Sequence, residues 1–189
     1  NDNSINTSLW TATNSTDITI SEVSGALKQA SDATYSGSQN ETSFVSNNAY
    51  NFTDKKLEID IISMTLGGTL NRLGGWSISI FDNGNANNQA YIYVDQNVNG
   101  YVRSNNGVNS STTVTWNGTY TKFRLQHQAS DNKWLFYSYT SGTWTLRFTS
   151  AAANWNPTAC KIKMVAYIYG ISAISREVIV DNLITDIRT

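Results

Sequence analysis

The chain has 189 residues, of which 40% are hydrophobic, 12% are aromatic and only 14% are charged, and its net charge is −1. A chain this close to neutral offers no basic surface for nucleic acid or anionic lipid. We therefore expect no nucleic-acid partner. No apolar run approaches the roughly 20 residues that a membrane-spanning helix needs, so we expect no membrane insertion. The length suits one domain, placed at residues 1–189.

Short strands are predicted along the whole chain, because apolar and polar residues alternate in runs bounded by turn formers. Gly25 interrupts an early run as a turn or bulge, and the alternation of residues 55–64 breaks at Ile62, which predicts a β-bulge. In chain order the predicted strands lie at residues 9–10, 17–23, 25–30, 42–50, 55–64, 74–83, 89–95, 101–104, 108–116, 121–128, 134–140, 144–150, 158–170 and 175–187.

Two hairpin patterns stand out. Asn99-Gly100 is typical of a type I′ turn and predicts a hairpin between its flanking strands. Asp131-Asn132 and Ser141-Gly142 divide residues 121–150 into a three-strand meander. The face of this meander that we expect to be buried carries Phe123, Leu125, His127, Trp134, Phe136, Trp144, Leu146 and Phe148.

No segment of ten residues or more has helical periodicity, so we predict an all-β chain. This many short strands with polar connections fit a two-sheet antiparallel β-sandwich, and jelly-roll topology is a common way to arrange them.

Four features together resemble a known superfamily. They are the early Leu9-Trp10 pair, the pattern S-x-x-AY-x-F-x-x-x-x-LEIDI at residues 46–61, the meander, and the closing VIVDNL at residues 178–183. The combination is similar to the concanavalin A-like lectin/glucanase jelly rolls, which include laminin-G-like domains and many carbohydrate-associated modules. The resemblance implies the fold, whereas the superfamily contains sugar binders, protein binders, glycosidases and structural modules.

Aromatic side chains on the strands suggest a ligand surface. Sugars stack their apolar faces on aromatic rings while amide and guanidinium groups bind the hydroxyls at the edge. Tyrosines are also good sheet residues, so each one has a purely structural interpretation as well. Trp155 precedes Pro157 in a loop. Two interpretations fit it: a binding platform, or a plug over the sandwich end. The predicted carbohydrate-binding residues are Tyr91, Tyr93, Tyr101, Arg103, Arg124, Gln126 and Trp155, with Tyr167 and Tyr169 on a further strand.

Calcium is the one cofactor that the sequence suggests. Asp95, Asn97 and Asn99 occupy positions one, three and five of a calcium-loop pattern, with glycine at position six, although Asn106 replaces the closing glutamate. A simple hairpin turn explains the same residues. The resemblance also implies calcium near the last strand, through Asp181, which could instead accept backbone hydrogen bonds.

Residues suited to catalysis are few. Glu58 and Asp60 resemble the opening of the E-x-D-x-(x)-E signature of jelly-roll glucanases, but the third acid is missing, so two outward surface charges are the simpler interpretation. His127 has no partner at a recognisable spacing and is expected in the core. Cys160, the only cysteine, is expected to be a buried thiol. We therefore do not expect an enzyme.

The preferred hypothesis is non-catalytic binding of a polysaccharide or glycan. A composition rich in asparagine, serine and threonine, with only 13 lysines and arginines, suits a secreted or cell-surface protein. The alternative is a structural or adhesive surface or filament subunit that self-associates through protein–protein contacts, which would need a long unpaired edge strand or a sizeable apolar patch.

Overall fold

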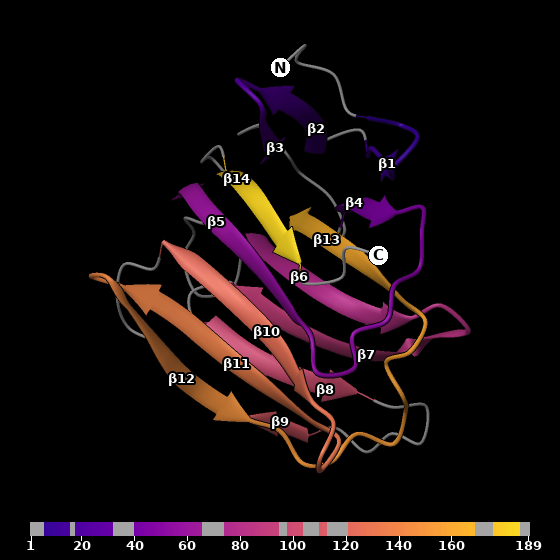
Figure 1. Cartoon of the computed structure of the whole chain (residues 1–189). Helices are drawn as coiled ribbons and strands as arrows, with labels where there is room; N and C mark the ends of the chain where they lie inside the picture. Colours follow the sequence, from indigo (N-terminus) through magenta and orange to yellow (C-terminus); the bar gives the residue numbers. More distant parts are fainter. Residues whose placement is uncertain are drawn as a thin grey trace.

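The chain folds as two antiparallel sheets packed face to face, as the sequence predicted (Figure 1). The computed structural model describes residues 6–15, 18–31, 40–65, 74–94, 98–103, 110–112, 121–168 and 176–185. These residues form strands, turns and loops, and none of them forms a helix that could cross a membrane.

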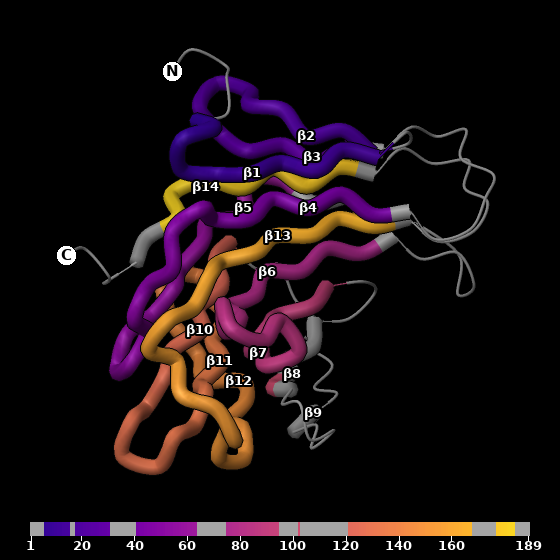
Figure 2. The backbone as a smooth tube through the Cα atoms, turned by 90° about the vertical axis from the view of Figure 1, so that its right-hand side faces the viewer, coloured from indigo at the N-terminus to yellow at the C-terminus, as the bar shows by residue number. Residues whose placement is uncertain are grey.

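Sheet A contains seven strands in the described part of the chain, in the order β1-β4-β13-β6-β7-β8-β9. Strands distant in sequence are neighbours in it, because β13 lies between β4 and β6 (Figure 2). Its strands are β1 (Trp10–Thr13), β4 (Asn40–Ser46), β6 (Gly74–Asp82), β7 (Asn85–Val94), β8 (Val98–Arg103), β9 (Ser110–Thr112) and β13 (Cys160–Ile168).

Sheet B has the order β12-β11-β10-β5-β14-β3-β2. The predicted meander forms one end of it, and β14, near the end of the chain, lies in its interior. Its strands are β2 (Ile18–Val23), β3 (Ala26–Ser31), β5 (Lys56–Thr65), β10 (Lys122–Gln128), β11 (Lys133–Thr140), β12 (Thr143–Thr149) and β14 (Arg176–Thr185).

One core fills the space between the sheets, built from alternate residues of each strand. Trp76, Ile78 and Ile80 of β6 point inward from sheet A and are at most 1% exposed. Phe123 and Leu125 of β10 belong to the same core from sheet B and are at most 2% exposed. Burying a side chain of this size stabilises the fold by about 1.5–3 kcal/mol, so the alternating pattern fixes which face of each sheet turns inward.

A loop carrying Trp155 closes one end of the sandwich. Trp155 is only 6% exposed, and its ring lies 5.6 Å from that of Trp134. Asn132 Nδ2 donates to the carbonyls of Ala153 and Trp155, and Asn132 Oδ1 lies 2.8 Å from Nε2 of the buried His127. Trp155 is therefore a plug in the core and not an exposed binding platform, while the prediction of a core histidine is confirmed.

Two predicted irregularities are also confirmed. Ser24 and Gly25 form a tight turn with positive φ angles of 53° and 87°, a backbone shape that favours glycine. Two consecutive residues of β14, Ile179 and Val180, pair with Ser63 and Ile61 of β5. The pairing skips Ile62, which is therefore a bulged residue and is 60% exposed.

The outer end of the meander differs from the prediction. The register between β11 and β12 shifts after the pair of Phe136 with Phe148. The next pair on β12 uses Leu146, so Arg147 is an extra, bulged residue. A one-residue shift turns the remaining side chains to the other face, which leaves Leu146 48% exposed and Trp144 partly exposed. The prediction that these two are core residues is wrong.

The hairpin of β7 and β8 exists, but its turn is elsewhere than predicted. Asn99 and Gly100 lie within β8, where they pair with Tyr93 and Ile92. The connection between the two strands falls at residues 95–97, which lie outside the described residues. Strand pairing therefore extends past the residue pair that resembled a type I′ turn.

Candidate functional site

The outer surface of sheet A carries a row of tyrosines that we call the tyrosine face. It comprises Tyr91 and Tyr93 of β7, Ser77 of β6, and Lys163 and Tyr167 of β13, all partly exposed. Intervening residues of the same strands are buried, because successive side chains point to opposite faces of a sheet. Alternation thus gathers aromatic, hydroxyl and ammonium groups on one outward surface.

Tyr93 and Tyr167 form an ordered ring pair on this face. Their ring centroids lie 5.5 Å apart and their planes differ by 11°. Tyr167 belongs to β13 and Tyr93 to β7, so the pair spans the intervening strand β6 at Gly75. A Cβ at Gly75 would lie 2.0 Å from Tyr167 Oη, so the absence of a side chain at Gly75 is what allows the phenol to lie across β6.

Two more of the predicted binding residues belong to β8, the neighbour of β7 in sheet A. Tyr101 pairs with Tyr91, and Arg103 pairs with Gln89. Tyr91 and Tyr93 share the tyrosine face, whereas for Tyr101 and Arg103 the structure describes the strand pairing alone. Tyr169 lies outside the described residues. The contribution of Gly75 was missed from the sequence, where the Gly74-Gly75 pair at the start of β6 was its only signal.

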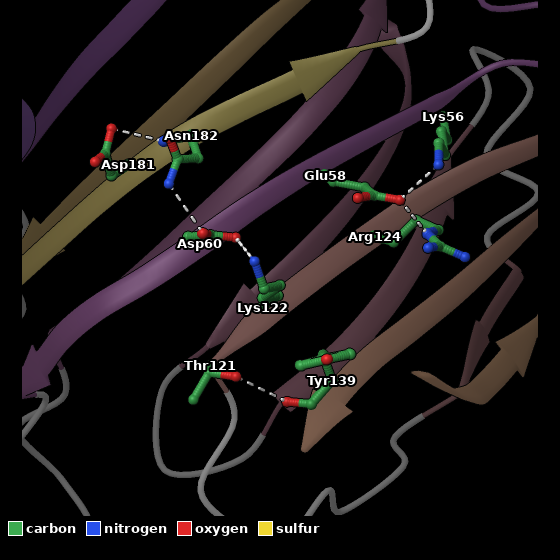
Figure 3. A network of polar contacts seen from close by, with 9 residues as sticks. All are labelled: Lys56, Glu58, Asp60, Thr121, Lys122, Arg124, Tyr139, Asp181 and Asn182. Carbon is green, nitrogen blue, oxygen red and sulfur yellow. Dashed lines mark hydrogen bonds and ion pairs between the residues drawn. The ribbon is translucent and has the colours of Figure 1, made fainter. Parts of the chain in front are cut away.

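The outer surface of sheet B is different in character, and we call it the charged face (Figure 3). Glu58 Oε1 lies 2.7 Å from Arg124 Nε and 2.9 Å from Lys56 Nζ, and Asp60 Oδ1 lies 2.7 Å from Lys122 Nζ. The hydrogen bond from Lys122 to Asp60 raises the pKa of that lysine above its ordinary 10.5. Each carboxylate is held by cations on its own strand or on the adjoining strand.

Arg124 is fixed in place on the charged face. Its guanidinium carbon lies 4.0 Å from the ring centroid of Trp144 and 5.3 Å from that of Tyr137, both cation–π distances. Glu58 accepts its Nε–H from the adjoining strand. These contacts position Arg124 as part of the sheet surface and cover one face of the Trp144 ring.

The predicted binding residues do not form one groove. Arg124 and Gln126 alternate with the buried residues of β10 and therefore face outward from sheet B. Tyr91, Tyr93 and Tyr101 belong to sheet A. Because the outer faces of a two-sheet sandwich point in opposite directions, one small ligand cannot contact both sets.

Only two of the four suggested metal ligands, Asn99 and Asp181, lie within the described residues. Asp95 and Asn97 lie outside the described residues, and Asn99 is a paired residue of β8. Asp181 Oδ1 accepts the backbone N–H of Asn182 at 2.7 Å, and Asn182 Nδ2 donates to Asp60 Oδ2 at 3.1 Å. Within the described ranges no three His, Cys, Asp or Glu side chains cluster as metal ligands would. Calcium binding stays a prediction.

Comparison with known proteins was made by sequence and by structure. No protein-family model matches the chain, and no curated protein sequence matches it. Solved structures do match. A legume lectin-like domain from Entamoeba histolytica is 10% identical, with a TM-score of 0.59 over 92% of this chain and 89% of that one.

Two further structural neighbours are proteins of other kinds. An immunostimulatory antigen and pseudo β-1,3-glucanase of Mycobacterium tuberculosis is 12% identical, with a TM-score of 0.64 over 93% of this chain and 89% of that one. A carbohydrate-binding module from Bacillus subtilis is 16% identical, with a TM-score of 0.50 over 88% and 94%. The chain has a concanavalin A-like jelly-roll fold. At these identities the likeness concerns the fold alone, and the resemblance read from the sequence is confirmed at that level.

Proposed function

We propose that this protein binds carbohydrate through the tyrosine face, as a non-catalytic module secreted or displayed at a cell surface. The observation that carries the proposal is the near-parallel pair of Tyr93 and Tyr167, which Gly75 permits to lie across β6. Aromatic rings at a sheet surface suit the apolar faces of sugar rings. Ser77 and Lys163 add a hydroxyl and an ammonium at neighbouring outward positions for sugar hydroxyls.

The names of the structural neighbours support this proposal. A lectin-like domain and a carbohydrate-binding module share the fold over most of both chains. One neighbour is named a pseudo-glucanase, so a catalytic alternative needs its own argument from this chain's residues.

The positions of the carboxylates support binding without hydrolysis. Glycoside hydrolysis commonly needs two carboxyl groups about 5–9.5 Å apart across the sugar. The described outward positions of β6, β7 and β13 around the tyrosine pair carry none, and Glu41 of β4, opposite Tyr167, is a single carboxylate beside them. Glu58 and Asp60 lie on the other sheet, in ion pairs with lysine and arginine.

A polysaccharide and glycan binding screen on the purified protein tests the proposal. Tyr93→Ala and Tyr167→Ala should each weaken binding about tenfold, the equivalent of a stacking energy near 1.4 kcal/mol. Gly75→Ala should also weaken binding about tenfold. It retains every aromatic ring, but its Cβ would displace Tyr167. Tyr139→Ala, on the charged face, is the matched control and should bind as the parent does.

Two results would reverse the assignment. If Tyr139→Ala lost binding and the Tyr93 and Tyr167 variants kept it, the charged face would be the site. If a broad panel gave no binding by a folded protein that elutes as a large species, the structural or adhesive alternative would replace carbohydrate binding. Repeating the screen with a chelator tests the calcium prediction, which requires affinity to fall when calcium is removed.

A further inference from the structure

A cavity of about 220 Å³ lies between the two sheets, on the opposite side of sheet A from the tyrosine face. Sheet A contributes Trp10, Phe44 and Met164 to its wall, and sheet B contributes Leu27, Ile59 and Val180. Figure 2 shows the strands that carry these residues side by side at the end of the sandwich that holds the β2–β3 turn.

The cavity is partly open to solvent, so it is a pocket at the end of the sandwich and not an enclosed void. An engineered apolar cavity of about 150 Å³ in another protein stays dry and binds benzene. The space here exceeds that volume, and its wall includes the stacked rings of Trp10 and Phe44, whose centroids lie 4.6 Å apart. It can therefore hold a small apolar molecule in contact with aromatic and aliphatic side chains.

Polar groups lie along the same lining and define the other end of a ligand. Glu22 of β2 provides a carboxylate there, because it alternates with the buried Ile18 and Ile20 and so lies on the inward side of its sheet. The described residues that line the cavity include no lysine or arginine. Carboxylates attract ammonium groups and accept hydrogen bonds from hydroxyls, whereas they repel a carboxylate. An anionic head, such as that of a fatty acid, is therefore disfavoured.

We propose that this cavity binds a small apolar molecule that ends in an ammonium or hydroxyl group. The apolar body fills the space between the sheets, and the head group meets Glu22 at the lining. This site is separate from the tyrosine face, so either site can exist without the other.

Three probes with the same body test the site: naphthylmethylamine, naphthylmethanol and naphthoic acid. Isothermal titration calorimetry on the whole protein should give saturable binding of the amine and the alcohol. The acid should bind at least about tenfold more weakly, the ratio that 1.4 kcal/mol of repulsion produces. Glu22→Gln should remove the preference for the amine over the acid.

Cavity-filling variants test the location. Leu183 and Leu27 line the cavity and are only partly buried, so Leu183→Trp and Leu27→Phe can occupy the space with little cost to folding. Each should abolish binding of the amine, while Leu146→Trp on the exposed side of β12 leaves it unchanged. Unaltered binding in both filled variants, equal affinity for acid and amine, or no binding of any probe at millimolar concentration would overturn the proposal. The glycan screen is scored separately on the same proteins.

Discussion

Burial sets the chemistry of the single thiol. Cys160 has no exposed surface and begins β13, where it pairs with Asp82 of β6. Loss of solvation raises the pKa of Cys160 from 9.0 to about 12, and the negative charge of Asp82 adds to the rise. The thiol therefore remains protonated in the folded protein over a pH range in which it ionises in the unfolded chain.

Two consequences of this raised pKa can be measured. At neutral pH a thiol reagent should modify Cys160 only as fast as the protein unfolds. Between pH 9.0 and about 12 the unfolded chain loses this proton first, so the group's contribution to stability is complete below pH 9.0 and declines as the pH rises. In urea unfolding over that window, stability should fall less steeply with pH for Cys160→Ala than for the parent. Equal slopes, or rapid labelling of the folded protein, would contradict the burial argument.

Sequence predicted the burial of individual residues well in regularly paired strands, and poorly in loops and beyond a register shift. His127 is 2% exposed, as the alternation of β10 indicated. Trp155 could not be placed, because a loop residue has no period and its position depends on Trp134 and Asn132, far away in the sequence. Local pattern carries no information about such contacts.

At the scale of the strand, ion pairs between adjacent strands differ in how much they stabilise the fold. Glu58 faces Arg124 across β5 and β10, and their side chains are only 13% and 16% exposed. Glu177 is paired with Lys28 across β14 and β3, with side chains about twice as exposed. Ion pairs screened by water contribute a few tenths of a kcal/mol, and less exposed ones contribute more.

We expect Glu58→Gln to lower the free energy of unfolding by about 1 kcal/mol, because it weakens contacts to Arg124 and Lys56 together. The matched change Glu177→Gln should cost about 0.3 kcal/mol. Urea denaturation at low and high salt measures both, and the difference should shrink as salt screens the charges. Equal effects of the two changes would show that burial does not distinguish these pairs. Glu58→Gln should leave glycan binding intact.

Strand positions were predictable to within a few residues, while register was not. The predicted β-bulge at Ile62 had a visible break in alternation, but the bulge at Arg147 follows a run that alternates in sequence. Register depends on partner strands, and only the structure shows that Leu146 and Trp144 turn outward. The same shift brings Trp144 beneath Arg124.

For the whole molecule, a buried polar network ties the two sheets together. Trp76 Nε1 on β6 donates to Gln29 Oε1 on β3 at 3.0 Å. Gln29 Nε2 donates to the carbonyl of Thr42 on β4, and Thr42 Oγ1 donates to that of Ile18 on β2. Such groups are costly when a partner is removed, since the remaining one stays buried and unpaired.

Gln29→Leu should therefore lower the free energy of unfolding by about 2 kcal/mol, because the indole N–H of Trp76 loses its acceptor. Gln126→Leu, on the outer face of β10, is the matched control and should change stability by less than about 0.5 kcal/mol. Urea denaturation followed by circular dichroism gives both values. Adding Trp76→Phe to Gln29→Leu should cost less than the sum of the single changes, and strict additivity would argue against the network.

The candidate site was predictable in part. The sequence suggested Tyr91 and Tyr93 for a ligand surface, and both lie partly exposed on sheet A, but the sequence could not show that Arg124 belongs to the opposite sheet. Sheet membership follows from the pairing of strands distant in sequence, which one-dimensional patterns do not encode. The cavity had no sequence signal, since its lining comes from seven strands, the β2–β3 turn and the segment before β1.

The interior positions of β13 and β14 have a consequence for how the chain is made. β13 separates β4 from β6, and β14 separates β5 from β3, so both sheets are incomplete until residues 160–185 are available (Figure 2). A ribosome adds about 5–20 residues per second, so earlier strands wait for seconds with open edges. Those edges are templates for wrong pairing between nascent chains. Efficient production of this protein should thus depend on factors that shield emerging polypeptides, because the fold completes only once residues 160–185 have been made.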